Sequence, residues 1–250
     1  MLDACKIAGA GTTVVITGDI AEAPSLIPFM SKWRTALEAN KFNLKFICGN
    51  HDYYNGNIKN KRLDLSNDMA GAWLPTCGVV SLTQTTALVG HDGWYDGLYS
   101  NWFESRLDMN DYYLIDELNS MLKTKVQRFE KLQELSQESA DYVYMEGSSA
   151  LKTHKTLFIA THVPPFMEAA YFKGKMSDSD WLPHFSSKRM GDAILNLAKE
   201  NPKSEITVLC GHTHVGVEGS HICNPAKNVV CYTGCAEYGA PRIGEIFTIE

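Results

Sequence analysis

Short apolar runs recur along the chain, and most of them stop abruptly at a glycine or a polar residue. The clearest runs cover 12–17, 45–48, 155–161 and 206–210. Their residues are mostly aliphatic or β-branched, and turn-forming residues bound them, which is typical of buried strands. Weaker runs predict further strands at 79–82, 85–89, 229–233 and 243–249. The chain is therefore predicted to contain β-sheet built from several short strands.

Between the strands, apolar residues recur at spacings of three and four. After the first strand this pattern comprises Leu26, Ile27, Phe29, Met30, Trp33 and Leu37. Such spacing predicts an amphipathic helix with one buried face. The same reasoning predicts a short helix over 69–74, a long helical region over 107–151 and a helix over 190–198. Strands that alternate with helices indicate a parallel sheet with helical cover, in the α/β class.

Polar residues directly follow the carboxyl ends of four of the predicted strands. These exits are Gly18-Asp19, Gly49-Asn50-His51-Asp52, His162 and Gly211-His212-Thr213-His214. Any one of them could be an ordinary turn, because Asn, Asp and Gly are common turn residues. Ligands bind at the carboxyl ends of strands in open α/β sheets, however, and His, Asp and Asn are ligands for divalent metals. The fourfold repetition therefore favours a metal site.

A fifth strand exit, over 90–97, is rich in glycine and aromatic residues. Two interpretations are open. In the first, the loop borders the site, with His91 or Asp92 near a bound phosphate and Trp94 or Tyr95 against the substrate. In the second, the segment is a glycine-rich turn whose aromatic residues simply pack. Loops on a rigid scaffold carry function disproportionately often, so both interpretations merit a structural test.

Composition bounds the class of protein. A chain of 250 residues is long enough for one sizeable core, and we expect a single domain over 1–250. The net charge of −6 argues against a broad basic surface, so duplex nucleic acid is not an expected partner. A small phosphate ester is compatible with this charge, because a metal centre can supply positive charge locally.

The cysteines and the hydropathy pattern bear on the compartment. The seven cysteines are odd in number and include no Cys-x-x-Cys pair, which indicates a reduced, cytoplasmic protein. No stretch approaches the ~18 apolar residues of a membrane span, so we expect no membrane partner. The sequence does not indicate the oligomeric state.

Taken together and in this order, the four exits resemble the motifs of the calcineurin-like metallophosphoesterase superfamily. The Gly-His-Thr-His at 211–214 and the lack of Asp-Arg-Gly after Gly18-Asp19 resemble its phosphodiesterase side. The resemblance implies a four-layer α-β-β-α sandwich. It also implies hydrolysis of a small phosphate ester by a hydroxide that divalent metals activate. The enzyme type implied is a phosphodiesterase, and the choice between monoester and diester substrates stays open.

The resemblance further implies a ligand set for two divalent metal ions. Asp19 would bridge both ions, and Asn50, His162 and His212 would complete the first site. His214 would bind the second ion, because it and His212 are expected to alternate along an extended segment and to point apart. A set of nitrogen and oxygen donors suits Mn, Fe or Zn.

His51 follows a ligand but is not one in the family pattern. The resemblance implies that it protonates the leaving oxygen or stabilises the phosphoryl charge, which suits an imidazole that titrates near neutrality. Asp52 has two open interpretations: it orients His51, or it caps a following helix.

One family motif is missing. An Asp-x-His should precede Gly18-Asp19 on an earlier strand, but no Asp in the chain is followed two residues later by His. Residues 2–8 are similar to the tail of an amphipathic helix, so we expect a form shortened at its amino terminus. The alternative is a catalytically impaired metal-binding or interaction protein that retains the fold.

Overall fold

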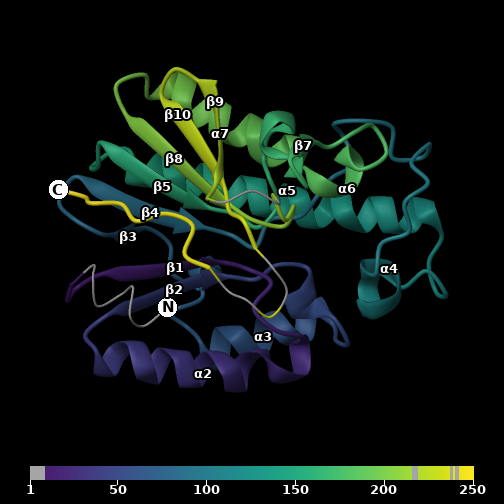
Figure 1. Ribbon diagram of the computed structural model, residues 1–250, viewed down its shortest axis with the longest axis horizontal. Coiled ribbons are helices and arrows are strands. Elements are labelled where there is room, and N and C mark those ends of the chain that lie inside the picture. The colour runs from purple at the N-terminus through teal and green to yellow at the C-terminus, as the bar shows by residue number, and fades with distance from the viewer. Residues whose placement is uncertain (1–8, 216–218, 237–238, 240–241) are drawn as a thin grey trace.

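The structure is a computed structural model that describes residues 9–215, 219–236, 239 and 242–250. Two β-sheets face each other, and helices cover the outer side of each sheet (Figure 1). The predicted half-helix over 2–8 lies outside the described residues. The layers follow the order helix, sheet, sheet, helix, which confirms the expected α-β-β-α sandwich.

The smaller sheet contains two parallel strands. β1 (Thr13–Thr17) pairs in register with β2 (Asn43–Ile47). The helices α2 (Ala23–Ala39) and α3 (Ile58–Asp68) cover its outer side. Apolar residues of α2, α3 and β2 belong to one buried cluster that also includes Trp102, Leu132 and Leu135, so this core continues beyond the smaller sheet.

The larger sheet has six strands in the order β3-β4-β5-β8-β10-β9. Their bounds are β3 (Val80–Ser81), β4 (Thr86–Gly90), β5 (Thr156–Ala160), β8 (Glu205–Cys210), β9 (His221–Ala226) and β10 (Val229–Thr233). The central strands β4, β5, β8 and β10 are parallel, and β3 and β9 run antiparallel at the two edges. The helices α5 (Lys125–Ala150) and α7 (Lys188–Glu200) pack on the outer face of this sheet.

Strand β5 shows how one strand serves two layers. Leu157 and Ile159 pack among the residues of α5 and α7. Phe158 and Ala160 point the other way and pack with Ile47 of the smaller sheet. Since successive side chains of a strand face opposite sides, a continuous apolar run is what a strand buried on both faces requires.

Short elements connect these layers. They are the 3₁₀ turns η1 (His51–Tyr53), η2 (Leu74–Thr76), η3 (Asp116–Leu118) and η4 (Met167–Ala169), the helices α4 (Asp111–Leu114) and α6 (Leu182–Phe185), and the hairpin strands β6 (Tyr171–Phe172) and β7 (Lys175–Met176).

The structure corrects the prediction of one long helical region over 107–151. That region contains α4, η3 and then α5, which begins only after Thr124. Thr124 and Gln127 form a capping box, in which each side chain bonds the other residue's backbone N–H, and this fixes the start of α5. Residues 69–73 do not form the predicted helix, and the 3₁₀ turn η2 begins at Leu74. α3 was not predicted, because only Ile58 and Leu65 of its residues are buried and its apolar period is weak.

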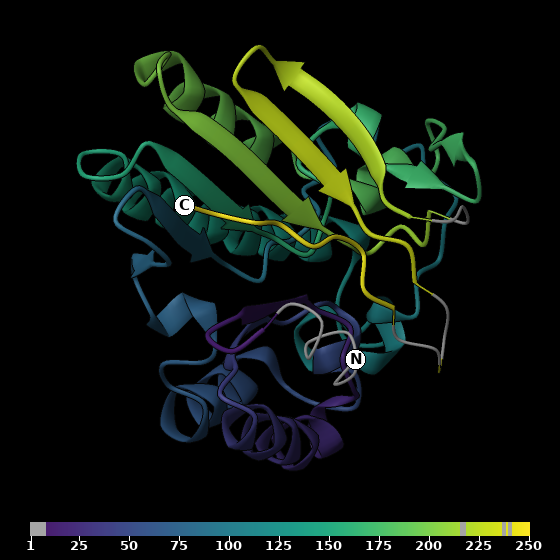
Figure 2. The same ribbon diagram turned by 60° about the vertical axis from the view of Figure 1, so that its left-hand side comes forward.

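The predicted strand over 243–249 is also wrong. This segment forms no strand, and it runs between the two sheets in both views (Figures 1 and 2). The ring of Phe247 packs edge-on against Phe158 and Tyr232, with ring centroids 5.2 Å apart in each pair. The apolar pattern therefore does not correspond to a hydrogen-bonded ladder, and Ile243, Ile246 and Phe247 remain exposed despite the ring contacts.

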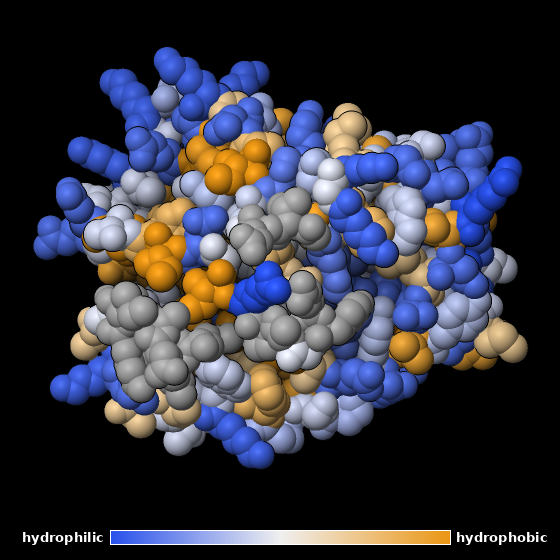
Figure 3. Space-filling model, in the orientation of Figure 1, coloured by the Kyte–Doolittle hydropathy of each residue, from blue (hydrophilic) through white to orange (hydrophobic). Residues whose placement is uncertain are grey.

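The face in Figure 3 is mostly polar, and its apolar side chains form separate small patches. Scattered surface apolar groups of this kind are ordinary for a globular domain. No helix in the described ranges is long and apolar enough to cross a bilayer.

Candidate metal centre

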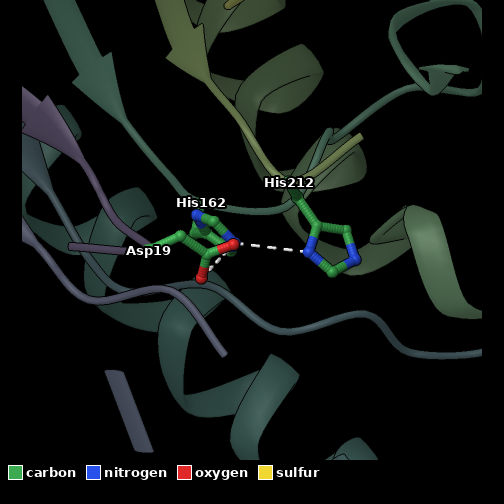
Figure 4. A group of neighbouring side chains, drawn as sticks. All are labelled: Asp19, His162 and His212. Carbon is green, nitrogen blue, oxygen red and sulfur yellow. Dashed lines mark hydrogen bonds and ion pairs between the residues drawn. The ribbon is translucent and has the colours of Figure 1, made fainter. Parts of the chain in front are cut away.

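Four polar side chains meet where β1, β2, β5 and β8 end. His162 Nε2 lies 3.3 Å from Asp19 Oδ1, 3.2 Å from Asn50 Oδ1 and 3.3 Å from His212 Nδ1. His212 Nδ1 lies 3.0 Å from Asn50 Oδ1. Figure 4 shows Asp19, His162 and His212 pointing toward one another from three different strand ends. The structure thus brings together the four residues predicted for the first metal.

Both imidazoles are held by backbone carbonyls on their far sides. His162 Nδ1 lies 2.7 Å from the carbonyl oxygen of Thr17, and His212 Nε2 lies 3.0 Å from that of His184. A carbonyl only accepts hydrogen bonds, so each of these nitrogens carries the proton. In the neutral rings, the lone pairs of His162 Nε2 and His212 Nδ1 then face the cluster, which is how histidines that bind metals are usually oriented.

The Asn50 amide has a definite orientation. Its Nδ2 donates to Asp111 Oδ1 at 2.8 Å and to the hydroxyl of Tyr54 at 3.2 Å. An ionised carboxylate accepts only, so the NH₂ group must face Asp111. Asn50 Oδ1 is therefore left facing His162 and His212.

These contacts leave too few protons inside the cluster. Asp19 Oδ1, Asn50 Oδ1 and His212 Nδ1 are all acceptors, and they surround His162 Nε2. One proton on His162 Nε2 cannot serve three acceptors well. A divalent cation could accept electron pairs from all four atoms at once, so the donor set fits a metal ion.

The electrostatics of the metal-free cluster agree with this account. Burial opposes a charge on His162, but the carboxylate of Asp19 outweighs it and raises the pKa of His162 to about 9. Burial likewise favours the neutral form of Asp19, yet His162 and the other imidazoles hold the pKa of Asp19 well below its usual value. Burial, followed by the charge of His162, lowers the pKa of His212 to about 3. A metal would thus displace a single proton, from His162.

The backbone is constrained at the same place. Asp19, His212 and His214 all adopt the left-handed region, with φ of 54°, 68° and 43°. Such conformations cost roughly 1–2 kcal/mol per residue and cluster at functional sites. They also correct the expectation that His212 and His214 lie on an extended segment, because the chain turns there and Thr213 N donates to the carbonyl of Gly211.

Gly49 lets the two sheets approach closely. A Cβ at this position would lie 2.2 Å from Asp19 Oδ1 and 2.5 Å from His162 Cε1. Only a residue without a side chain leaves room for these two groups to meet.

His51 lies beside the cluster. Its backbone N–H donates to Asp19 Oδ1 at 3.0 Å, and its Nε2 lies 4.0 Å from Asp19 Oδ2. Its ring stacks on Tyr54 with centroids 4.4 Å apart, and 26 % of its side chain is exposed. His51 therefore combines contact with the cluster and access to solvent.

The contacts of Asp52 show a role that the sequence analysis did not consider. One carboxylate oxygen accepts from the backbone N–H groups of Ile20 and Ala21, and the other accepts from Gly49 N. Burial, and then the charge of Asp19, raise the pKa of Asp52 to about 7. Asp52 joins the loops after β1 and β2 and so fixes the spacing of Asp19 and Asn50.

His214 is half-buried, and it is not among the described residues whose ligand atoms converge in the cluster. Its carbonyl accepts from Lys173 N in the β6–β7 hairpin, which covers this loop. Burial lowers its pKa, whereas the nearby charge of Asp19 acts in the opposite direction. The charge of Asp19 thus acts on His214, but the structure does not bring His214 into the cluster.

The structure corrects the substrate-contact expectation for His91 and Asp92. Both are buried, and Asp92 accepts from Cys48 N, the Trp73 indole and the Tyr53 hydroxyl. His91 packs against the ring of Tyr142 instead. A carboxylate with three donors and no exposed surface has no capacity left for a substrate.

The same loop does reach the cluster through another residue. The ring of Tyr95 stacks on His212 with centroids 6.1 Å apart, and its hydroxyl donates to Asp111 Oδ2 at 2.8 Å. The sequence analysis considered Trp94 or Tyr95 as a substrate contact and did not predict that Tyr95 packs on a proposed metal ligand. It gave no signal for Asp111, which lies within the predicted long helical region over 107–151.

Comparisons with known proteins bear on the family and the fold. The Calcineurin-like phosphoesterase family model matches residues 1–216. A search of curated proteins found no significant match. The fold is similar to a dimetal phosphatase from Danio rerio, with 17 % identity, a TM-score of 0.50, and coverage of 89 % of this chain and 71 % of that one. A structure described as GAP50, the anchor in the inner membrane complex of Plasmodium, aligns with 13 % identity, a TM-score of 0.43, and coverage of 95 % and 65 %. On the strength of the family match, the chain belongs to the calcineurin-like phosphoesterase family.

Proposed function

We propose that this chain hydrolyses phosphate esters, of the phosphodiester type, at a divalent metal centre formed by Asp19, Asn50, His162 and His212. The observation that carries the proposal is the convergence of these four donors around one proton site. Membership of a phosphoesterase family supports the reaction class.

In this proposal each ligand has a distinct task. Asp19 would supply the negative charge, and together with His214 it would hold a second ion. Asn50, His162 and His212 supply neutral donors whose directions are fixed by Asp111, Thr17 and His184. Divalent ions bound here, such as Mn, Fe or Zn, would neutralise phosphoryl charge and activate water.

His51 is the proposed acid for the leaving oxygen. It is partly exposed, so a substrate can approach its imidazole, and its backbone is anchored to Asp19. Stacking on Tyr54 limits the ring to a narrow range of orientations. A fixed imidazole near a phosphoryl group can donate a proton to the departing alkoxide.

The direct experiment measures bound metal and turnover in the same preparations. Wild-type protein is incubated with Mn²⁺, its metal content is determined, and hydrolysis of bis(p-nitrophenyl) phosphate is compared with that of p-nitrophenyl phosphate. The proposal expects bound metal and faster hydrolysis of the diester, and it expects both to be lost in His212→Ala. Metal binding without hydrolysis of either ester would instead favour a non-catalytic metal-binding protein.

A further inference from the structure

Asp111 lies at the start of α4, far along the chain from every strand exit, yet it contacts the candidate metal centre. The residue is fully buried. Its Oδ1 accepts from Asn50 Nδ2 at 2.8 Å and from the Tyr54 hydroxyl at 2.7 Å, and its Oδ2 accepts from the Tyr95 hydroxyl at 2.8 Å. The carboxylate therefore has three donors, one of which is the amide of a proposed ligand.

The contact matters because the orientation of the Asn50 amide decides whether it can bind a metal. The two ends of an asparagine amide are nearly equal in size, but only the oxygen has lone pairs to offer a cation. A flipped Asn50 would present two N–H donors to the cluster and no ligand atom. Packing alone distinguishes the two orientations poorly, whereas an ionised carboxylate accepts only and thus selects one of them.

We propose that Asp111 is a positioning residue that keeps Asn50 Oδ1 directed at His162 and His212, and that it thereby sets the affinity of the centre for metal. This inference rests on the proposed function, because it presumes that Asn50 is a ligand. Asp111 itself does not reach the reacting atoms in this account.

Two tyrosines extend the influence of Asp111 to other site residues. Tyr54 donates to Asp111 and stacks on His51, and Tyr95 donates to Asp111 and stacks on His212. One buried carboxylate thus connects a proposed ligand, a second proposed ligand and the proposed acid. Buried networks of this kind are rigid when every member is satisfied and costly when one is not.

The test compares Asp111→Asn with Asp96→Asn. Asp96 is a matched control, because it too is fully buried and accepts three hydrogen bonds, from Leu98 N, Arg189 N and the Ser187 hydroxyl. None of these donors belongs to the centre. Calorimetric titration with Mn²⁺ should show affinity reduced by about 10–100-fold in Asp111→Asn, the usual effect of losing a group that orients a ligand. Affinity in Asp96→Asn should equal that of the wild type, even where its melting temperature falls.

A second readout needs no metal. In the metal-free wild type, the two side-chain amide protons of Asn50 should exchange slowly with solvent in NMR spectra, because they are buried against Asp111 and Tyr54. Exchange should accelerate in Asp111→Asn and stay slow in Asp96→Asn. If wild-type protein binds no metal, the proposed function fails, and this readout still decides whether Asp111 orients the amide.

Tyr54→Phe and Tyr95→Phe cover the case in which Asp111→Asn does not fold. Each removes one hydroxyl that holds Asp111 and leaves the ring in place. Both should weaken Mn²⁺ binding and speed exchange of the Asn50 amide, by less than Asp111→Asn does. Folded variants that retain wild-type metal affinity and slow amide exchange would overturn the inference.

Discussion

His162 Nδ1 lies 2.7 Å from the carbonyl oxygen of Thr17, so a side chain from the larger sheet is held by the backbone of the smaller one. The same division runs through the whole centre. Asp19 and Asn50 follow the strands of the two-stranded sheet, whereas His162 and His212 follow strands of the six-stranded sheet. A metal bound by all four residues would therefore cross-link the two halves of the sandwich.

Metal should accordingly stabilise the smaller sheet more than the rest of the protein. A two-stranded sheet is marginal by itself, and a ligand at about 100 times its dissociation constant adds ~2.7 kcal/mol to the free energy of unfolding. We expect Mn²⁺ to raise the melting temperature and to slow amide hydrogen exchange in β1 and β2, with less effect in β9. Equal protection in all of these strands would contradict a cross-link between the sheets.

Metal affinity should depend on pH through His162. Its pKa in the metal-free protein is raised to about 9, so below that pH a metal must displace a proton from Nε2. Affinity should fall about tenfold for each pH unit below 9 until another ligand begins to protonate. Titrations at pH 7 and 8, in buffers with different ionisation enthalpies, should report release of about one proton per first metal bound. Binding without proton release would show that His162 is already neutral.

The stability of the metal-free protein should also depend on the protonation of His162, but in the opposite direction: it should fall as the pH rises. A group whose folded pKa exceeds its unfolded value stabilises the fold below the unfolded pKa, and this stabilisation disappears as the pH rises through the folded value. For His162 the two values are 6.5 and about 9. The metal-free melting temperature should therefore decline between pH 7 and 9.5, and His162→Gln should remove most of that decline. A decline of equal size in the variant would locate the titrating group elsewhere.

His51 and Asn50 are neighbours in the sequence, but the proposal gives them different tasks. His51→Ala should lower kcat by about 10²–10⁴-fold, the range for loss of an acid–base group, with metal content nearly unchanged. Asn50→Ala should lose metal first and activity as a consequence, so excess Mn²⁺ should restore part of its activity but none of that of His51→Ala. Equal metal loss in the two variants would refute this division of tasks.

The sequence could predict candidate ligand positions because they follow directly from short stretches of neighbouring residues. Each ligand follows an apolar run directly, and the carboxyl ends of parallel strands must meet at one edge. The strand exits could thus be recognised as candidate ligand positions, and the resemblance to the family selected Asp19, Asn50, His162 and His212 as one ligand set. The buried strands and amphipathic helices predict a parallel sheet with helical cover, whereas the four-layer sandwich was implied by the family resemblance.

The predictions that were wrong or missing concern residues whose role depends on contacts with residues far away in the sequence. Asp92 occupies a strand exit, as Asp19 does, but Trp73 and Tyr53 surround its carboxylate and make it part of the core. Asp111 is the opposite case: it was not predicted, yet it contacts the site. Nothing near it in the sequence distinguishes a buried carboxylate from a solvated one. Its importance arises only where α4 packs against the loop that carries Asn50.

Two of the three motif glycines, Gly49 and Gly211, give a prediction that the sequence alone could not make. Both precede proposed ligands, and by sequence they look equivalent. A Cβ at Gly49 would lie 2.2 Å from Asp19 Oδ1, whereas one at Gly211 would make its nearest contact at 3.4 Å, with the hydroxyl of Thr17. Gly49→Ala should force Asp19 or His162 out of place, abolish metal binding and destabilise the fold by about 1–3 kcal/mol, as overpacking usually does.

Gly211→Ala is the matched control. Its added methyl group meets ordinary van der Waals contacts, so the variant should bind Mn²⁺ and unfold as the wild type does. Calorimetric titration and thermal melts of the two variants, prepared side by side, make the comparison. Comparable metal loss in both would show that the motif glycines are needed for the conformation of their loops, and that the close approach of Asp19 and His162 at Gly49 is not the deciding constraint.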